Sequence, residues 1–160
     1  MAIRNVTKNY AGRTVDVNIS GNPDPKTTGV QPVGLRFGLV STRCVGVQKL
    51  LQRYAVMLLT SKGSQRNSPD FGTDLIPTLL GGNLIDAGQL VHTFNLASWT
   101  VVRGLREYQS AHPEMPLDEQ INTALLTNYD VQGSTVRFNV KIQTQACETI
   151  DFILPVVTPD

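Results

Sequence analysis

The chain has 160 residues, of which 41% are hydrophobic and 17% are charged, a composition that fits one globular domain and excludes a disordered, fibrous or membrane protein. The 14 basic and 13 acidic residues leave a formal net charge of +1, so no footprint suited to a nucleic-acid backbone is expected. The N-terminus lacks the apolar stretch of a signal peptide and no apolar run could span a bilayer, so we expect a soluble protein made in a cytoplasm.

The first forty residues predict a β arm followed by a connector. Val15, Val17 and Ile19 alternate with polar residues, which is the period of a half-buried strand. The stretch 20–34 is crowded with Pro, Gly, Asn and Thr and has no repeating apolar face, as in a loop or flexible linker. We therefore expect an arm with its connector at residues 1–40 and a main domain at residues 41–160.

Two helices are predicted next. Apolar residues recur at helical spacing from Val47 onward, and we expect a helix from Thr42 to Thr60, which the polar segment that follows ends. A longer helix is predicted from Leu84 to Tyr108. Its core stripe consists of Ala87, Leu90, Val91, Phe94, Val101, Leu105 and Tyr108.

The opposite side of the long helix is also partly apolar. His92, Leu96 and Trp99, together with Ile85, share that side at helical spacing, which a surface helix has no reason to maintain. We expect a partner or the N-terminal arm to cover it, and a neighbouring element of the same domain is the alternative. His92, Leu96 and Trp99 are therefore candidate interface residues.

The last forty residues return to the strand period. Alternating runs begin near Ile121, Val136 and Ile150, and turn residues separate them. They predict a three-stranded antiparallel meander with one face on the helices. The expected fold class is thus α+β, with helices packed on a C-terminal meander and an N-terminal β arm.

Residues for catalysis are few. His92 reads as a packed or interfacial side chain and His112 as a loop residue, and neither has a partner at metal-ligand spacing. The common nucleophile and phosphate-binding motifs are absent. Cys44 and Cys147 are expected to be ordinary buried side chains. We expect no catalytic residue, no cofactor and no metal.

One segment carries a resemblance. LLTSKGSQRNSPDFGTDL, which begins at Leu58, resembles the signature of the phage-tail baseplate wedge family, whose members are often catalogued as lysozyme-like. The family pattern has a helix ending in Leu-Thr, then a Gly, then Pro-x-Phe-Gly, and Thr60, Gly63, Pro69, Phe71 and Gly72 hold these places. Here Ser64-Gln65 replaces the Glu-Arg that often follows the first Gly. The glycines permit positive φ, the proline stiffens the loop, and Phe71 is expected to anchor it in the core.

A second motif of the family lies at the entry to its first C-terminal strand. Asp118-Glu119-Gln120 resembles it, with Glu119 at the acidic position and Gln120 where Arg is usual. Glu119 is therefore a candidate interface residue, and a solvated carboxylate at a strand start is the alternative.

The resemblance implies a structural wedge subunit in the tail baseplate of the virion, made in the host cytoplasm and present in six copies. Its expected partners are other wedge subunits, the central hub or spike proteins and the tail sheath, and not nucleic acid or membrane. The family's C-terminal sheet resembles a connecting domain of the sheath, to which sheath arms add strands. Asp151 and Ile153 are the first candidates for this docking edge.

Two other interpretations remain open. The family's label suggests a muralytic, lysozyme-like enzyme, for which Asp70, Asp74, Glu107, Glu114, Asp118 and Glu119 could supply a pair of carboxyls. The same domain could also serve as the equivalent subunit of a phage-derived injection machine.

Overall fold

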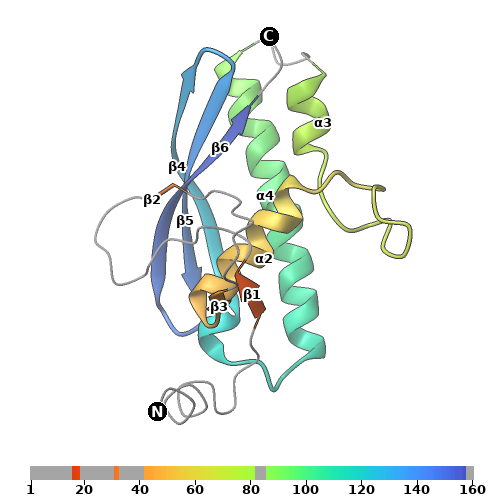
Figure 1. The fold of residues 1–160 in the computed structure, drawn as a ribbon, viewed down its shortest axis with the longest axis vertical. Coiled ribbons are helices and arrows are strands. Elements are labelled where there is room, and N and C mark those ends of the chain that lie inside the picture. Colours follow the sequence, from red (N-terminus) through yellow and green to blue (C-terminus); the bar gives the residue numbers. More distant parts are fainter. Residues whose placement is uncertain (1–15, 19–30, 33–41, 82–85, 158–160) are drawn as a thin grey trace.

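The computed structural model describes residues 16–18, 31–32, 42–81 and 86–157 (Figure 1). The C-terminal meander consists of β4 (Ile121–Gln132), β5 (Thr135–Thr144) and β6 (Thr149–Val157), and both neighbouring pairs are antiparallel. The prediction of three antiparallel strands is confirmed. A short 3-10 turn, η1 (Leu117–Glu119), leads into β4.

One face of this sheet is buried. In β5 and β6 every second residue is inaccessible, as the alternation in the sequence predicts. These residues are Val136, Phe138, Val140 and Ile142 in β5 and Ile150, Phe152, Leu154 and Val156 in β6.

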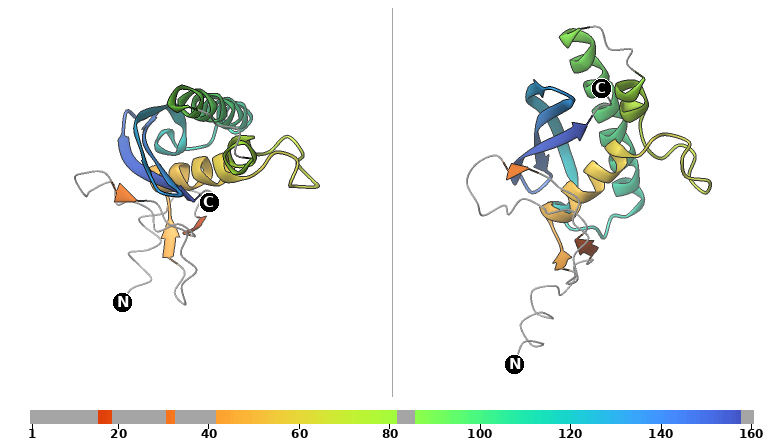
Figure 2. Two further views of the ribbon diagram at one scale, coloured as in Figure 1. Left: turned by 90° about the horizontal axis from the view of Figure 1, so that it is seen from above. Right: turned by 45° about the horizontal axis from the view of Figure 1, so that its top comes forward.

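Helices cover that buried face (Figure 2). Phe94 of α4 (Ala87–Ala111) stacks on Phe138 of β5 with ring centroids 4.5 Å apart. Tyr54 of α2 (Val47–Leu59) meets Phe152 of β6 edge to face at 6.2 Å. The short helix α3 (Leu75–Leu80) adds Leu75 and Leu79 to the same core. The fold is α+β, as expected.

The helix boundaries differ from the prediction. The first helix starts at Val47 rather than Thr42, because Thr42–Cys44 forms strand β3 and Gly46 at φ +62° turns the chain before the helix. The long helix is shifted toward the C-terminus. Asp86 caps its start by accepting a hydrogen bond from the Gln89 amide at 2.8 Å.

The core stripe of the long helix is confirmed at its centre. Leu90, Phe94, Val101 and Leu105 are buried. Ala87 and Tyr108 are exposed, since they lie at the two ends of a helix that extends past the core.

Two short strands of the predicted arm lie on the main domain. β1 (Asp16–Asn18) pairs antiparallel with β3, and β2 (Gln31–Pro32) pairs parallel with β6. The described sheet therefore has the order β2-β6-β5-β4. Val15 and Ile19 lie outside the described residues.

Candidate functional site

The segment between α2 and α3 is a closed loop that projects from the helices (Figure 1). Its two ends lie side by side: the Thr73 amide donates to the Thr60 carbonyl at 2.8 Å, and the Lys62 amide donates to the Thr73 carbonyl at 3.0 Å. Further out, the Gly63 amide donates to the Pro69 carbonyl at 2.9 Å. We call residues 60–73 the projecting loop. Hydrogen bonds between backbone groups of the loop itself therefore hold it closed.

The motif residues hold this loop closed. Gly72 has φ +103°, and a Cβ atom there would lie 2.4 Å from the Thr60 carbonyl oxygen, so only glycine fits between the two ends. Gly63 also has positive φ, +79°, but the space around it is open. The Thr60 hydroxyl donates to the Val56 carbonyl at 2.6 Å and finishes α2.

The predicted core anchor of the loop is wrong. Phe71 is only half-buried and is not among the side chains packed against the core. Thr73 anchors the loop instead. Its buried hydroxyl donates to the Leu58 carbonyl at 2.7 Å and accepts from the Leu75 amide at 3.2 Å. The anchor is thus a set of hydrogen bonds to the ends of both helices.

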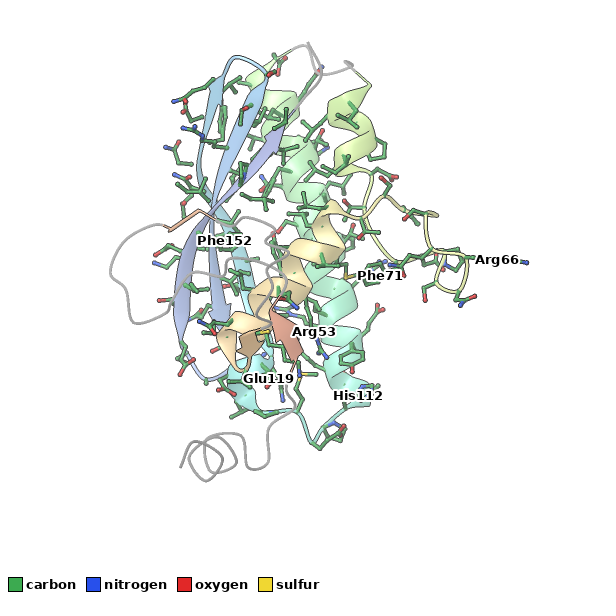
Figure 3. The ribbon with its side chains drawn as sticks, viewed as in Figure 1. Arg53, Arg66, Phe71, His112, Glu119 and Phe152 are labelled. Carbon is green, nitrogen blue, oxygen red and sulfur yellow. The ribbon has the colours of Figure 1, made fainter. Side chains whose placement is uncertain are left out.

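The outer part of the loop faces solvent. Residues 62–70 are all exposed, Pro69 among them, and Arg66 extends outward at the far end (Figure 3). Lys62 and Asp70 lie 3.9 Å apart with both side chains well exposed, which makes a weak pair. Residues 62–70 of the projecting loop therefore form a surface whose side chains have few contacts with the rest of the described domain.

A second exposed surface lies on α4. Leu96 is 58% exposed and Trp99 57%, and His92 is exposed on the same side, so the described elements of the domain leave this face open. The Arg103 guanidinium lies 5.0 Å from the centre of the Trp99 ring. Toward the C-terminus a shallow groove continues the face, lined by Trp99, Val102, Arg103, Arg106, Glu107 and Ser110. We call His92, Leu96 and Trp99 the α4 face.

Glu119 lies inside the domain. One carboxylate oxygen accepts from Lys49 Nζ at 2.9 Å, and the other accepts from the Gly46 amide at 3.4 Å. The two side chains are 3% and 1% exposed. Glu119 is therefore neither a solvated carboxylate nor the exposed interface residue that was predicted, because it holds the first turn of α2 to the entry of β4. Lys49 was not predicted, because its place on the helix reads as a polar surface position.

The two outer strands of the C-terminal meander, β4 and β6, differ. β4 has register irregularities between Ile121 and Thr123 and between Leu126 and Asn128, and Arg106 of α4 donates to the Asn122 carbonyl. β6 pairs with β5 without any irregularity, and its other side pairs with β2 at Phe152 and Ile153. Asp151 and Ile153 are half-buried and alternate with the buried residues of β6.

Most of the carboxylates that were candidates for catalysis lie apart on the surface. Asp70, Asp74, Glu107 and Glu114 are exposed, and Glu119 is engaged with Lys49. His112 stacks on Tyr108 at 4.1 Å, and Arg53 lies 5.0 Å from that Tyr ring (Figure 3). Cys44 is buried as expected, whereas Cys147 is exposed because it occupies a tight turn at φ +62°.

Within the described residues, no group of three His, Cys, Asp or Glu side chains could hold a metal ion. None of the helices in this part of the chain is long and apolar enough to cross a bilayer. Comparison of the sequence with models of known protein families finds no match, and comparison with curated proteins finds no significant relative.

Proposed function

We propose that this chain is a structural wedge subunit of a contractile phage-tail baseplate, present in six copies, which links other wedge subunits and the central hub or spike proteins to the first sheath ring. The observation that carries the proposal is the projecting loop. Its closure depends on Gly72 against Thr60, two of the residues that resemble the wedge family's signature.

The projecting loop favours a role in assembly. Fixing the backbone of an exposed segment costs about 1–2 kcal/mol per residue in conformational entropy. Residues 62–70 are exposed, so the burial of their side chains within the domain offsets little of this entropic cost. A segment whose backbone is already fixed loses less conformational entropy when it binds a neighbour. The closed loop is therefore suited to contact another subunit in a large assembly.

The α4 face supplies an anchor for a neighbouring wedge or hub subunit. Trp99 is more than half exposed beside Leu96, and large aromatic side chains dominate the energy of protein interfaces. The projecting loop and the α4 face belong to the helical layer, whereas the sheath is proposed to bind the sheet.

Of the two outer strands of the meander, β6 is the better docking edge. The register of β4 with β5 shifts twice, and the Arg106 side chain of α4 occupies the Asn122 carbonyl near the start of β4. β6 pairs with β5 in one unbroken register, so an arriving strand can keep one register with it, although Pro155 of β6 has no amide hydrogen to donate. An extended arm of the sheath protein would add to β6 through main-chain hydrogen bonds, near Asp151 and Ile153.

The equivalent subunit of a phage-derived injection machine would use the same surfaces. A muralytic enzyme is supported less well, since it needs two carboxyls facing each other across a cleft. Glu119, the family's acidic position, is instead buried against Lys49.

To test the proposal, an affinity-tagged chain would be expressed in the host during tail production, and tails would be purified and labelled with gold against the tag. Labels at the baseplate end of the tail are expected. Tagged chain that stays entirely in the unassembled fraction, while tails form normally from the untagged chain, would contradict the proposal.

A further inference from the structure

The α4 face continues into a basic surface along the same side of the helix. His92, Leu96 and Trp99 are followed by Arg103 and Arg106, and the steps between them alternate between four and three residues. Because an α-helix has about 3.6 residues per turn, these steps keep the side chains on one line along it. Every one of these side chains is exposed. The line is therefore open to a partner from His92 to Arg106.

The two halves of this line differ in chemistry. Leu96 is 58% exposed and Trp99 57%, so the first half is a large apolar surface. The second half is the groove, of about 250 Å³, whose lining includes Trp99, Val102, Arg103 and Arg106. An apolar side chain that enters this groove would contact Trp99 and Val102, with two guanidinium groups beside it.

The groove has an excess of positive charge. Arg103 and Arg106 line it together with a single acidic residue, Glu107. Arg103 Nε lies 3.7 Å from Glu107 Oε1, and both side chains are more than half exposed, so this ion pair is weak and an arriving carboxylate can replace it. Arg106 donates to the Asn122 carbonyl, which already restricts its side chain and lowers the entropic cost of pairing with a carboxylate. The charge of the groove therefore complements an acidic side chain.

A helix is the element that matches this line. A strand adds to a neighbour through main-chain N–H and C=O groups, and the middle of a helix has none to offer because its own ladder uses them. Side chains at alternating steps of three and four residues form the seam along which two helices pack. The line from His92 to Arg106 spans about four turns, enough for such a seam.

We propose that α4 docks an amphipathic helix of a neighbouring subunit, whose apolar stripe packs on Leu96 and Trp99 and whose carboxylates pair with Arg103 and Arg106. This inference rests on the proposed function and deepens it, because it names the chemistry of the partner at the α4 face. Arginine and carboxylate can form two parallel hydrogen bonds with a defined geometry. The charges therefore fix the register of a helix that the apolar contacts bind.

The test uses the full chain as a free subunit and two synthetic helical peptides, each about three heptads long and free of tryptophan. Both have leucine at alternating steps of three and four residues, and the flanking positions are glutamate in one and lysine in the other. Trp99 is the only tryptophan of the chain, so its emission reports binding at this face. The glutamate peptide should shift the emission to the blue and bind at least about tenfold more tightly than the lysine peptide. Equal binding of both peptides, or binding of neither, would overturn the inference.

Reversing one charge locates the site. Arg103→Glu should reverse the preference, so that the lysine peptide binds more tightly, and added salt should weaken the preference of either form. The matched control, Arg66→Glu, makes the same change of charge at the far end of the projecting loop and should leave the preference as it is (Figure 3). Circular dichroism would verify that both variants are folded. A preference for glutamate that survives Arg103→Glu unchanged would contradict a role for the groove.

Two other results would point elsewhere. Emission that shifts to the blue with protein concentration alone, together with a dimer in sedimentation, would assign the face to a second copy of this chain and overturn the acidic partner. The peptide results do not depend on tail assembly, so a negative result there leaves the wedge role intact. Absence of the tagged chain from all tails would overturn the wedge role itself.

Discussion

Lys49 and Glu119 are separated by seventy positions in the sequence, yet Lys49 Nζ lies 2.9 Å from Glu119 Oε2 and both side chains are almost fully buried. The Gly46 amide also donates to this carboxylate, at the entry to α2. The pair therefore connects the start of the first helix to the start of the C-terminal sheet. A buried ion pair is costly to break by removing one partner, because the other charge stays in the interior.

Removing one charge of this pair should destabilise the domain strongly. Glu119→Gln is expected to lower the free energy of unfolding by about 3–5 kcal/mol, measured by urea denaturation at pH 7. The double variant Lys49→Met with Glu119→Leu should recover most of the loss, because it removes both charges and keeps the volume. Equal losses in the single and the double variant would show that the ion pair itself is not the cause.

The two glycines of the projecting loop should respond differently to alanine. Gly72→Ala brings a Cβ atom into the Thr60 carbonyl at positive φ, so we expect a loss of about 3 kcal/mol or more, or an opened loop. Gly63→Ala meets open space and should cost only about 1–2 kcal/mol for its backbone conformation. Thermal unfolding measures both, and hydrogen exchange of the Thr73 amide reports whether the loop has opened. A milder effect at Gly72 than at Gly63 would contradict this account of the closure.

The α4 face should matter for assembly and hardly at all for folding. Trp99 is more than half exposed, so its fluorescence in the free subunit should resemble that of a solvated indole and shift to the blue in assembled baseplates. Trp99→Ser should change stability by no more than about 0.5 kcal/mol. The same variant should fail to enter tails, whereas Thr100→Ser, a neighbouring change off this face, should assemble normally. An emission that is already blue in the free subunit and stays unchanged on assembly would argue against a partner here.

Tyr54 should make the domain sensitive to alkali. Burial raises the pKa of its hydroxyl, although the hydrogen bond with Ser98 at 2.8 Å acts in the opposite direction. The stabilising contribution of the neutral hydroxyl is fully present below the unfolded pKa of about 10 and is lost as the pH rises above it. Tyr54→Phe should flatten the decline of stability above pH 10, measured by urea denaturation at a series of pH values. A decline as steep as in the unmodified protein would assign the alkaline sensitivity to other groups.

The purified protein should not hydrolyse peptidoglycan. Bacterial cell walls would be incubated with it, and the release of reducing sugar would be measured against a lysozyme control. Activity that disappears on replacing a single carboxylate, such as Glu114→Gln or Asp118→Asn, would instead support the muralytic interpretation.

The sequence predicts those parts of the fold whose residues repeat with a regular period. The residues of β5 alternate without interruption, those of β6 alternate except at Ile153, and α4 continues its helical spacing over many turns, so these elements follow from the local pattern. Strand β3 is missed because Thr42–Cys44 has no pattern of its own and owes its conformation to pairing with β1. Short strands depend on partners that a local reading cannot see.

The candidate sites are predictable to a similar extent. Gly72 could be identified from its place in a motif, and its conformation explains why glycine is needed. The burial of Lys49 could not be predicted from the sequence, since a lysine on an amphipathic helix is normally solvated and its partner Glu119 is far away in the sequence. Thr73 was also missed, because nothing local marks a threonine that will bond the ends of two helices.

A high-resolution image reconstruction of the intact tail tests the wedge role most directly. We predict six copies of this domain between the central hub and the first sheath ring, with the projecting loop and Trp99 against neighbouring subunits and a sheath strand paired along β6. A reconstruction in which every baseplate density is accounted for by other chains, with none that fits this domain, would contradict the account.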